Sequence, residues 1–161
     1  MFQDSRQTAA ADPCGVQCGA VCWRMHRGRV KVLLITSRDT GRWVIPKGWA
    51  VSGLSVALCA AREAWEEAGV KGDLNENGLG DFRYDKILSG SAELPCQVQV
   101  FALRVLALSD RFPERKQRRR KWFDSAVAAQ KVHEPELRGL LAALPDLLGK
   151  LDPSAAALAP D

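Results

Sequence analysis

The chain has 161 residues, of which 47% are hydrophobic and 26% charged, and its formal net charge is +4. This length predicts one domain with a core that needs no disulfide or structural metal. No apolar run approaches the length of a membrane-spanning helix, and the polar start of the chain lacks the apolar core of a signal peptide, so we expect a cytoplasmic protein. Residues 1–14 are expected to be a disordered leader, residues 15–152 the domain, and residues 153–161 a flexible tail.

The first half of the chain predicts three strands and one helix. Runs rich in apolar and β-branched residues indicate strands at 16–25, 30–36 and 43–45. A loop bounded by glycines, 48–53, follows. Ser55 to Ala68 is expected to form a helix that Gly69 closes, since glycine is favoured just past a helix end.

The second half predicts a polar loop, more strands and a helical end. These elements are a loop at 71–80, strands at 82–88 and 97–107 with a loose connection at 89–95, a strand end at 122–123, a short helix to 130 and a terminal helix from 134. Asp124 or Ser125 is expected to cap the short helix, and Pro145 to end or kink the last one. The pattern indicates an α+β fold, a helix–sheet–helix sandwich on a mixed sheet.

The five cysteines favour a structural role. Cys14, Cys18 and Cys22 recur every four residues, which invites a metal-binding interpretation. Zinc sites, however, usually add a second ligand pair further along the chain, and none follows here. An odd number of cysteines without an export signal also argues against a disulfide framework. We therefore expect buried free thiols.

The helix at 55–68 carries the chemistry. One face is expected to pack on the sheet through an apolar stripe of Leu54, Leu58, Ala61, Trp65 and Ala68. Another face carries three glutamates at i, i+3 and i+4, with an arginine four residues before the second: Arg62, Glu63, Glu66 and Glu67. Carboxylates this close repel one another unless a cation neutralises them, and Mg²⁺ prefers oxygen ligands. The alternative is a solvated acidic face.

Between residues 115 and 121 the chain is almost continuously basic. The run contains Arg115, Lys116, Arg118, Arg119, Arg120 and Lys121. Such a run suits a polyanionic partner, although composition alone leaves a solvated, self-repelling loop equally plausible.

The segment from Gly48 to Val70 resembles the Nudix box, in which a glycine precedes an Arg-Glu-apolar-x-Glu-Glu-x-Gly-apolar helix at a fixed distance. The matching positions are Gly48, Arg62, Glu63, Glu66, Glu67, Gly69 and Val70, with Ala64 in the apolar slot. So many fixed positions make the signal specific. The resemblance implies a Nudix-like α/β/α sandwich that hydrolyses diphosphate linkages with Mg²⁺, or Mn²⁺ in its place.

The resemblance also implies roles for the residues of the box. Glu63 and Glu67 would be metal ligands, Glu66 would accept a proton from water, and the carbonyl of Gly48 would reach a metal. One position departs from the pattern, because the first glutamate of the box is replaced by Leu54. In the family that glutamate mainly braces the loop and the arginine, so its absence leaves the three helix carboxylates in place.

Beyond the box, the chain is similar to hydrolases of diphosphoinositol polyphosphates and diadenosine polyphosphates. The similarity lies in Thr36-Ser37-Arg38, in the segment from Arg42 to Pro46 and in the basic stretch before Trp122. It implies that cations and a hydroxyl bind the phosphates of a small-molecule polyphosphate: Ser37, Arg38, Arg42, Lys47, Arg118 and Arg120. Arginine suits this task through its planar fork of donors, although surface salt bridging would explain Arg38 and Arg42 equally well. Trp49, in the glycine loop, could shape the pocket or stack on a base.

Two other functions remain open at this point. The first is a Nudix enzyme for another nucleoside diphosphate derivative, such as a nucleoside triphosphate or a dinucleotide sugar. The second is a non-catalytic module that binds a polyphosphate or RNA, which Leu54 favours and the intact glutamates oppose. We expect no membrane partner, regard nucleic acid as the weaker hypothesis, and find no indication of the oligomeric state.

Overall fold

A computed structural model describes residues 15–88, 90 and 92–151, so the expected leader and most of the expected tail lie outside the described residues. The strands are β1 (Gly15–His26), β2 (Arg29–Thr36), β3 (Trp43–Val44), β4 (Lys47–Trp49), β5 (Val70–Leu74), β6 (Gly80–Ile87), β7 (Glu93–Leu108) and β8 (Arg120–Asp124). The helices are α2 (Val56–Ala68), α3 (Ser125–Lys131), α4 (Pro135–Ala142) and α5 (Leu144–Leu151). None of the described helices is long and apolar enough to cross a bilayer.

The strands form one mixed sheet with the long strands β1 and β7 at its centre. β1 and β7 run parallel from Gly15–Cys96 to Trp23–Arg104, and every other pairing is antiparallel. The main order is β3-β2-β1-β7-β5, while β4 pairs with β1, β6 with β7 and β8 with β2. The prediction of a mixed sheet is confirmed.

The sheet divides where β1 and β2 separate. These strands pair from His26–Arg29 to Cys22–Leu33 and then diverge. Beyond that point β2 pairs with β3, and the start of β1 pairs with β4. The two short strands and the turn before them therefore occupy the opening, where β4 lies beside Glu63 and Glu67 of α2.

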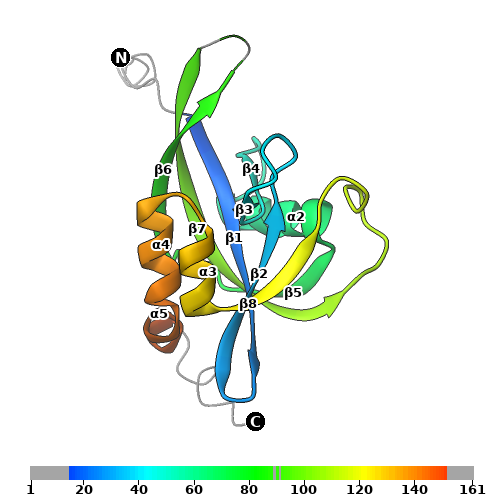
Figure 1. Cartoon of the computed structure of the whole chain (residues 1–161), viewed down its shortest axis with the longest axis vertical. Helices are drawn as coiled ribbons and strands as arrows, with labels where there is room; N and C mark the ends of the chain where they lie inside the picture. The colour runs from blue at the N-terminus through cyan, green and yellow to red at the C-terminus, as the bar shows by residue number, and fades with distance from the viewer. Residues whose placement is uncertain (1–14, 89, 91, 152–161) are drawn as a thin grey trace.

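Helices cover both faces of the sheet, so the α/β/α prediction is confirmed. Figure 1 shows α2 on one side and α3, α4 and α5 on the other. The core under α2 contains Cys18, Cys22, Leu33 and Leu103, and Leu54 packs against it. The larger core on the other face packs Val32, Phe82 and Val100 against Leu137 and Leu141.

The buried face of α2 differs from the predicted stripe. Its buried apolar residues are Ala57, Cys59, Ala60, Ala64 and Ala68, whereas Leu58 is 45% exposed. Small side chains let the helix lie close to the sheet. The ends of the helix agree with the prediction: the Ser55 hydroxyl accepts a hydrogen bond from the Leu58 amide, and Gly69 is left-handed with φ +69°.

Three local expectations were wrong. Residues 70–74, most of them expected in a loop, form the edge strand β5, and part of the glycine loop pairs as β4. The Asp124 side chain makes no cap for α3, since it is paired with Arg29 and Lys31. The expectation for Pro145 agrees with the structure: α4 ends at Ala142, shortly before the proline, which lies in the first turn of the next helix, α5.

Candidate active site

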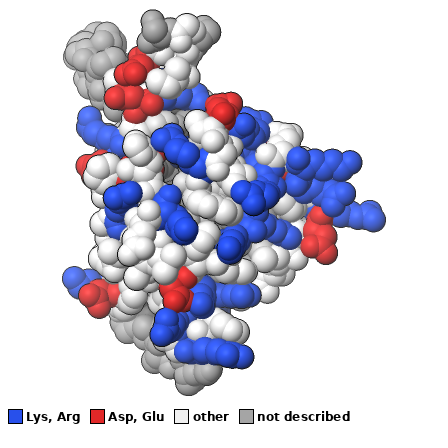
Figure 2. Space-filling model, in the orientation of Figure 1, with Lys and Arg blue, Asp and Glu red and all other residues white. Residues whose placement is uncertain are grey.

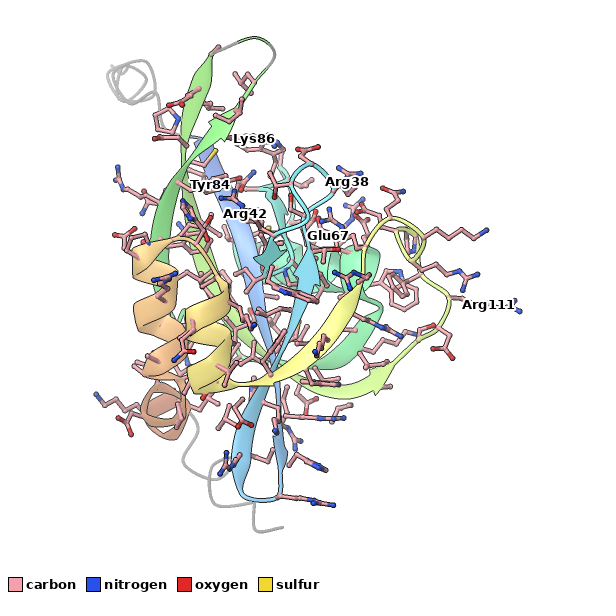
Figure 3. All side chains as sticks on the ribbon, viewed as in Figure 1. Arg38, Arg42, Glu67, Tyr84, Lys86 and Arg111 are labelled. Carbon is pink, nitrogen blue, oxygen red and sulfur yellow. The ribbon has the colours of Figure 1, made fainter. Side chains whose placement is uncertain are left out.

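A polar cleft of about 400 Å³ lies where the sheet divides, between the 37–42 turn, β4, the end of β6 and one side of α2. Of the residues predicted for the site, it is lined by Ser37, Arg38, Arg42, Lys47, Gly48, Glu63, Glu67 and Arg118. Figure 3 shows Arg38, Arg42, Tyr84 and Lys86 around it, with Arg111 far away on the 109–119 loop. Segments distant in the sequence therefore converge on one site.

Glu63 and Glu67 form a close carboxylate pair in the cleft. Glu67 is 7% exposed, and its carboxyl is hydrogen-bonded to that of Glu63 and, at 3.2 Å, to the amide of Lys47. Burial raises the pKa of Glu67 to about 8, with Glu63 adding to the rise and Arg118 opposing it. Burial also raises the pKa of Glu63. Two carboxylates held this way favour a shared proton or a cation.

Gly48 makes room for this pair. A Cβ at this position would lie 2.5 Å from Oε2 of Glu63, so no larger residue fits without displacing that carboxylate. The Gly48 carbonyl accepts a hydrogen bond from the Cys18 thiol at 3.5 Å. Gly48 therefore allows Glu63 to lie against the backbone, and its carbonyl accepts a hydrogen bond from Cys18, a residue of the core under α2.

Glu66 and Arg62 lie apart from the pair. The Arg62 Nε donates to Glu66 Oε2 at 3.0 Å, and neither residue lines the cleft. The ion pair is partly exposed, with Glu66 at 31% and Arg62 at 55%. The structure thus brings together two of the three predicted carboxylates and turns the third toward its arginine.

Arg118 contacts the carboxylate pair through Glu67. Its guanidinium contacts Glu114 at 2.8 Å, the Thr36 carbonyl at 3.1 Å and Glu67 at 3.5 Å, and its side chain is only 9% exposed. Glu114, which sequence reasoning missed, also lies in the cleft, 3.9 Å from Arg38. Arg118 therefore positions Glu67 more than it offers donors to a ligand.

The structure does not place Arg120 in the cleft. Its guanidinium donates to the Ala68 carbonyl at 2.7 Å, at the end of α2, and lies 4.9 Å from the ring centre of Phe112. Because β8 alternates its side chains, Arg120 points to the α2 face, where the carbonyls of the helix end attract a cation. The expected substrate-binding role of Arg120 is replaced by a contact that holds α2.

Lys47 lies among residues that the sequence did not single out. Its ammonium is 4.8 Å from the ring centre of Tyr84, whose hydroxyl donates to Gln17 at 2.7 Å. Burial lowers the pKa of Lys47, while Glu67 and the buried Glu134 oppose the change. The alternation of β6 could have indicated Tyr84, but nothing local in the sequence indicates Gln17 or Glu134.

Two buried thiols hold the loop that carries Gly48. Cys18 donates to the Gly48 carbonyl, and the Val51 amide donates to the Cys59 sulfur at 3.4 Å. The two thiols are also hydrogen-bonded to each other. Burial raises the pKa of Cys18 to about 12, and the contact with Cys59 adds to the rise, so the Cys18 thiol keeps the proton that it donates to Gly48. The four described cysteines are buried, and Cys18, Cys22 and Cys59 are free thiols, as expected.

The two carboxylates in the cleft suit Mg²⁺, an ion that does not need a shell made only of protein ligands. Among the residues that the structure describes, no group of three or more His, Cys, Asp or Glu side chains comes close enough to hold a metal. Mg²⁺ keeps several waters and is often bound by one or two carboxylates together with substrate phosphates. Glu63, which is partly buried, and Glu67, which is buried, repel each other beside Gly48 and have this character.

The fold and the site define a class of protein: an α/β/α sandwich in which the helix α2 presents glutamates to a cleft that is also lined by cations. A family profile described as "NUDIX domain" matches residues 16–144. The chain belongs to the Nudix family. That match confirms the resemblance to the Nudix box.

Curated relatives and solved structures agree with this family. Nudix hydrolase 12, mitochondrial, from Arabidopsis thaliana is 37% identical over 58% of this chain and 48% of its own length. Diphosphoinositol polyphosphate phosphohydrolase 3-alpha from Mus musculus is 30% identical over 80% of this chain and 78% of its own. The chain spans about half the length of the Arabidopsis relatives, Nudix hydrolases 12 and 13.

Two solved structures show the same fold. The Ap4A hydrolase of C. elegans aligns with a TM-score of 0.60 at 20% identity, over 84% of this chain and 98% of its own. The NUDIX domain of Shewanella oneidensis NrtR, complexed with ADP ribose, aligns with a TM-score of 0.64 at 16% identity, over 91% and 99%. At these identities the likeness concerns the fold alone.

Proposed function

We propose that this protein hydrolyses phosphoanhydride bonds in a polyphosphate, of the diadenosine polyphosphate or diphosphoinositol polyphosphate type, with Mg²⁺ or Mn²⁺ as cofactor. The observation that carries the proposal is the cleft in which the Glu63–Glu67 pair lies close to the cations Lys47, Arg38 and Arg42. The carboxylates suit a hard cation, and the cations suit phosphate oxygens. The relative named as a diphosphoinositol polyphosphate phosphohydrolase supports this substrate class.

Each residue has a proposed task. Glu63 and Glu67 would hold the metal ion, which when bound polarises phosphate oxygens and lowers the pKa of water. Lys47, Arg38, Arg42 and the hydroxyl of Ser37 would bind and orient the phosphates, and Arg118 keeps Glu67 in place. Glu66 is proposed as the proton acceptor, held by Arg62 on the turn next to the carboxylate pair.

Hydrolysis of diadenosine pentaphosphate, with Mg²⁺ and with a chelator, tests the proposal. We expect turnover only with the metal, and a loss of about 100-fold or more in Glu66→Gln if its carboxylate accepts the proton. Glu76→Gln, a change on the 75–79 loop away from the cleft, is the control that should keep wild-type turnover. Metal-independent turnover would contradict the metal assignment, and full activity of Glu66→Gln would remove Glu66 from the mechanism.

The pair of thiols gives a second test. Cys59→Ala removes the acceptor of the Val51 amide and the sulfur that contacts Cys18, so the loop at Gly48 is held less firmly. One hydrogen bond of ordinary strength corresponds to about a twofold to tenfold rise in the Mg²⁺ concentration for half-maximal activity. Cys59→Ser can accept the same hydrogen bond from the Val51 amide and should keep the wild-type value. Equal Mg²⁺ dependence in the two variants would show that the thiols only fill space.

A non-catalytic binding module is the remaining alternative. Figure 2 shows that Lys and Arg far outnumber Asp and Glu on the face viewed, over β8 and the 109–119 loop. Binding of RNA by this face would weaken steeply with salt, whereas hydrolysis in the cleft requires the metal. The Glu63–Glu67 pair favours the enzyme, because a module that only binds polyanions has no use for buried carboxylates beside its ligand.

A further inference from the structure

A large apolar side chain stands exposed in the otherwise polar cleft. Trp49 is 42% exposed and lines the cleft, as does Ile87, which is 63% exposed and comes from β6. Most of the other lining residues are charged or polar. An exposed indole in a cleft offers a flat apolar surface, and covering it with the ring of a ligand is favourable.

The indole of Trp49 packs against the first residue of β1. A Cβ at Gly15 would lie 2.5 Å from Cζ3 and 2.9 Å from Cη2 of Trp49, so the ring rests against the backbone at the start of β1. The same position lies 3.6 Å from Cδ2 of Leu94. A ring fixed by backbone contact loses little conformational freedom when a flat ligand stacks on its exposed part.

Strand geometry places this ring beside a phosphate-binding cation. Lys47 and Trp49 are two residues apart on β4, which pairs with β1 through Gly19–Lys47 and Gln17–Trp49. Side chains at this spacing project from the same face of a strand, about 7 Å apart. Gly48 faces the opposite way, toward Glu63. One face of β4 therefore offers a cation and an aromatic ring side by side.

A nucleotide carries the two matching groups, a phosphate and a flat base. We infer that Trp49 is a stacking platform for the nucleobase of a nucleoside polyphosphate whose phosphates contact Lys47 and the Glu63–Glu67 site. This rests on the proposed function and narrows it, since a substrate built on inositol has no aromatic ring to stack. Every base has a π-face, so the platform selects nucleotides over other phosphates without choosing among the bases.

Steady-state kinetics on two substrates test the inference. Trp49→Ala should raise KM for diadenosine pentaphosphate about tenfold with little change in kcat, because stacking binds the substrate before and during the reaction alike. Its KM for inorganic tripolyphosphate, which has no base, should stay unchanged. Trp49→Phe keeps a stacking ring and should restore most of the affinity. Leu106→Ala, at a side chain 60% exposed and outside the cleft, is the matched control.

Equilibrium binding separates this inference from the proposed function. ADP should quench tryptophan fluorescence in the wild type, pyrophosphate should not, and Trp49→Phe should abolish the ADP signal. If the wild type hydrolyses neither substrate, the proposed function fails while the quenching still decides the platform. A Trp49→Ala variant that raises KM equally for both substrates, or ADP quenching that persists in Trp49→Phe, would overturn the inference and leave Trp49 as an anchor of its loop.

Discussion

Replacing Glu67 by glutamine is expected to lower kcat about 100-fold to 1000-fold and to leave the fold intact. A bound metal contributes several kcal/mol to the stabilisation of a transition state, and the neutral amide is a poor ligand for a hard cation. The fold should survive because Arg118 keeps its contacts to Glu114 and to the Thr36 carbonyl. Burial raises the pKa of Glu67 to about 8, so replacing this carboxylate by a neutral amide also removes the cost of burying a charge there.

Turnover with saturating Mg²⁺ and a thermal unfolding curve measure the two effects separately. The matched control is Glu136→Gln on α4, which removes an exposed carboxylate whose oxygen accepts a hydrogen bond from the Arg83 amide. This control should keep wild-type turnover. Unchanged turnover in Glu67→Gln would remove Glu67 from the metal site, and an unfolded variant would mean that its role is structural.

Replacing Arg118 by methionine is expected to destabilise the protein by about 3 kcal/mol. Methionine keeps much of the side-chain volume but leaves Glu67 and Glu114 without their shared cation in a mostly buried position. Removing one partner of a buried ion pair costs about 3–5 kcal/mol of stability. Glu67 can take up a proton and lose its charge, so we expect a value near the lower end of this range. Urea unfolding monitored by circular dichroism gives the value.

The neighbouring arginine provides the control. Arg119 is exposed on the opposite face of the chain, with its guanidinium 5.5 Å from the ring centre of Trp43, so Arg119→Met should cost less than about 1 kcal/mol. A loss below about 1 kcal/mol for Arg118→Met as well would show that the ion-pair network adds little to stability.

The sequence predicted the parts of the fold that have strong local signals. The central strands, the helix at 55–68 and its ends at Ser55 and Gly69 follow from periodicity and capping chemistry. The resemblance to the box assigned Gly48 and Glu63 to one site, and the structure brings the two residues close together. These features depend on residues near one another in the chain, where propensity and geometry agree.

What the sequence could not predict depends on contacts between distant segments. β5 contains Gly72 and polar residues, and it forms because it pairs with the edge of β7, where a side chain at Gly72 would collide with the backbone of Arg104. The buried face of α2 consists of small residues such as Ala60 and Ala64, which carry too weak an apolar signal to outweigh Leu58. Glu114 enters the cleft from a loop, and no periodicity describes a loop.

The alternation of side chains along residues 118–121 has a consequence for interpreting natural variants. Arg118 and Arg120 point inward and are held by carboxylate and carbonyl oxygens, while Arg119 and Lys121 are exposed. An arginine-to-lysine change conserves charge at all three arginines. At the inward positions it removes a planar fork that one ammonium cannot replace, and at Arg119 it should be silent. Whether a substitution keeps the charge is therefore a poor guide to its effect in this segment. Whether the position is even-numbered and inward or odd-numbered and exposed is a better guide.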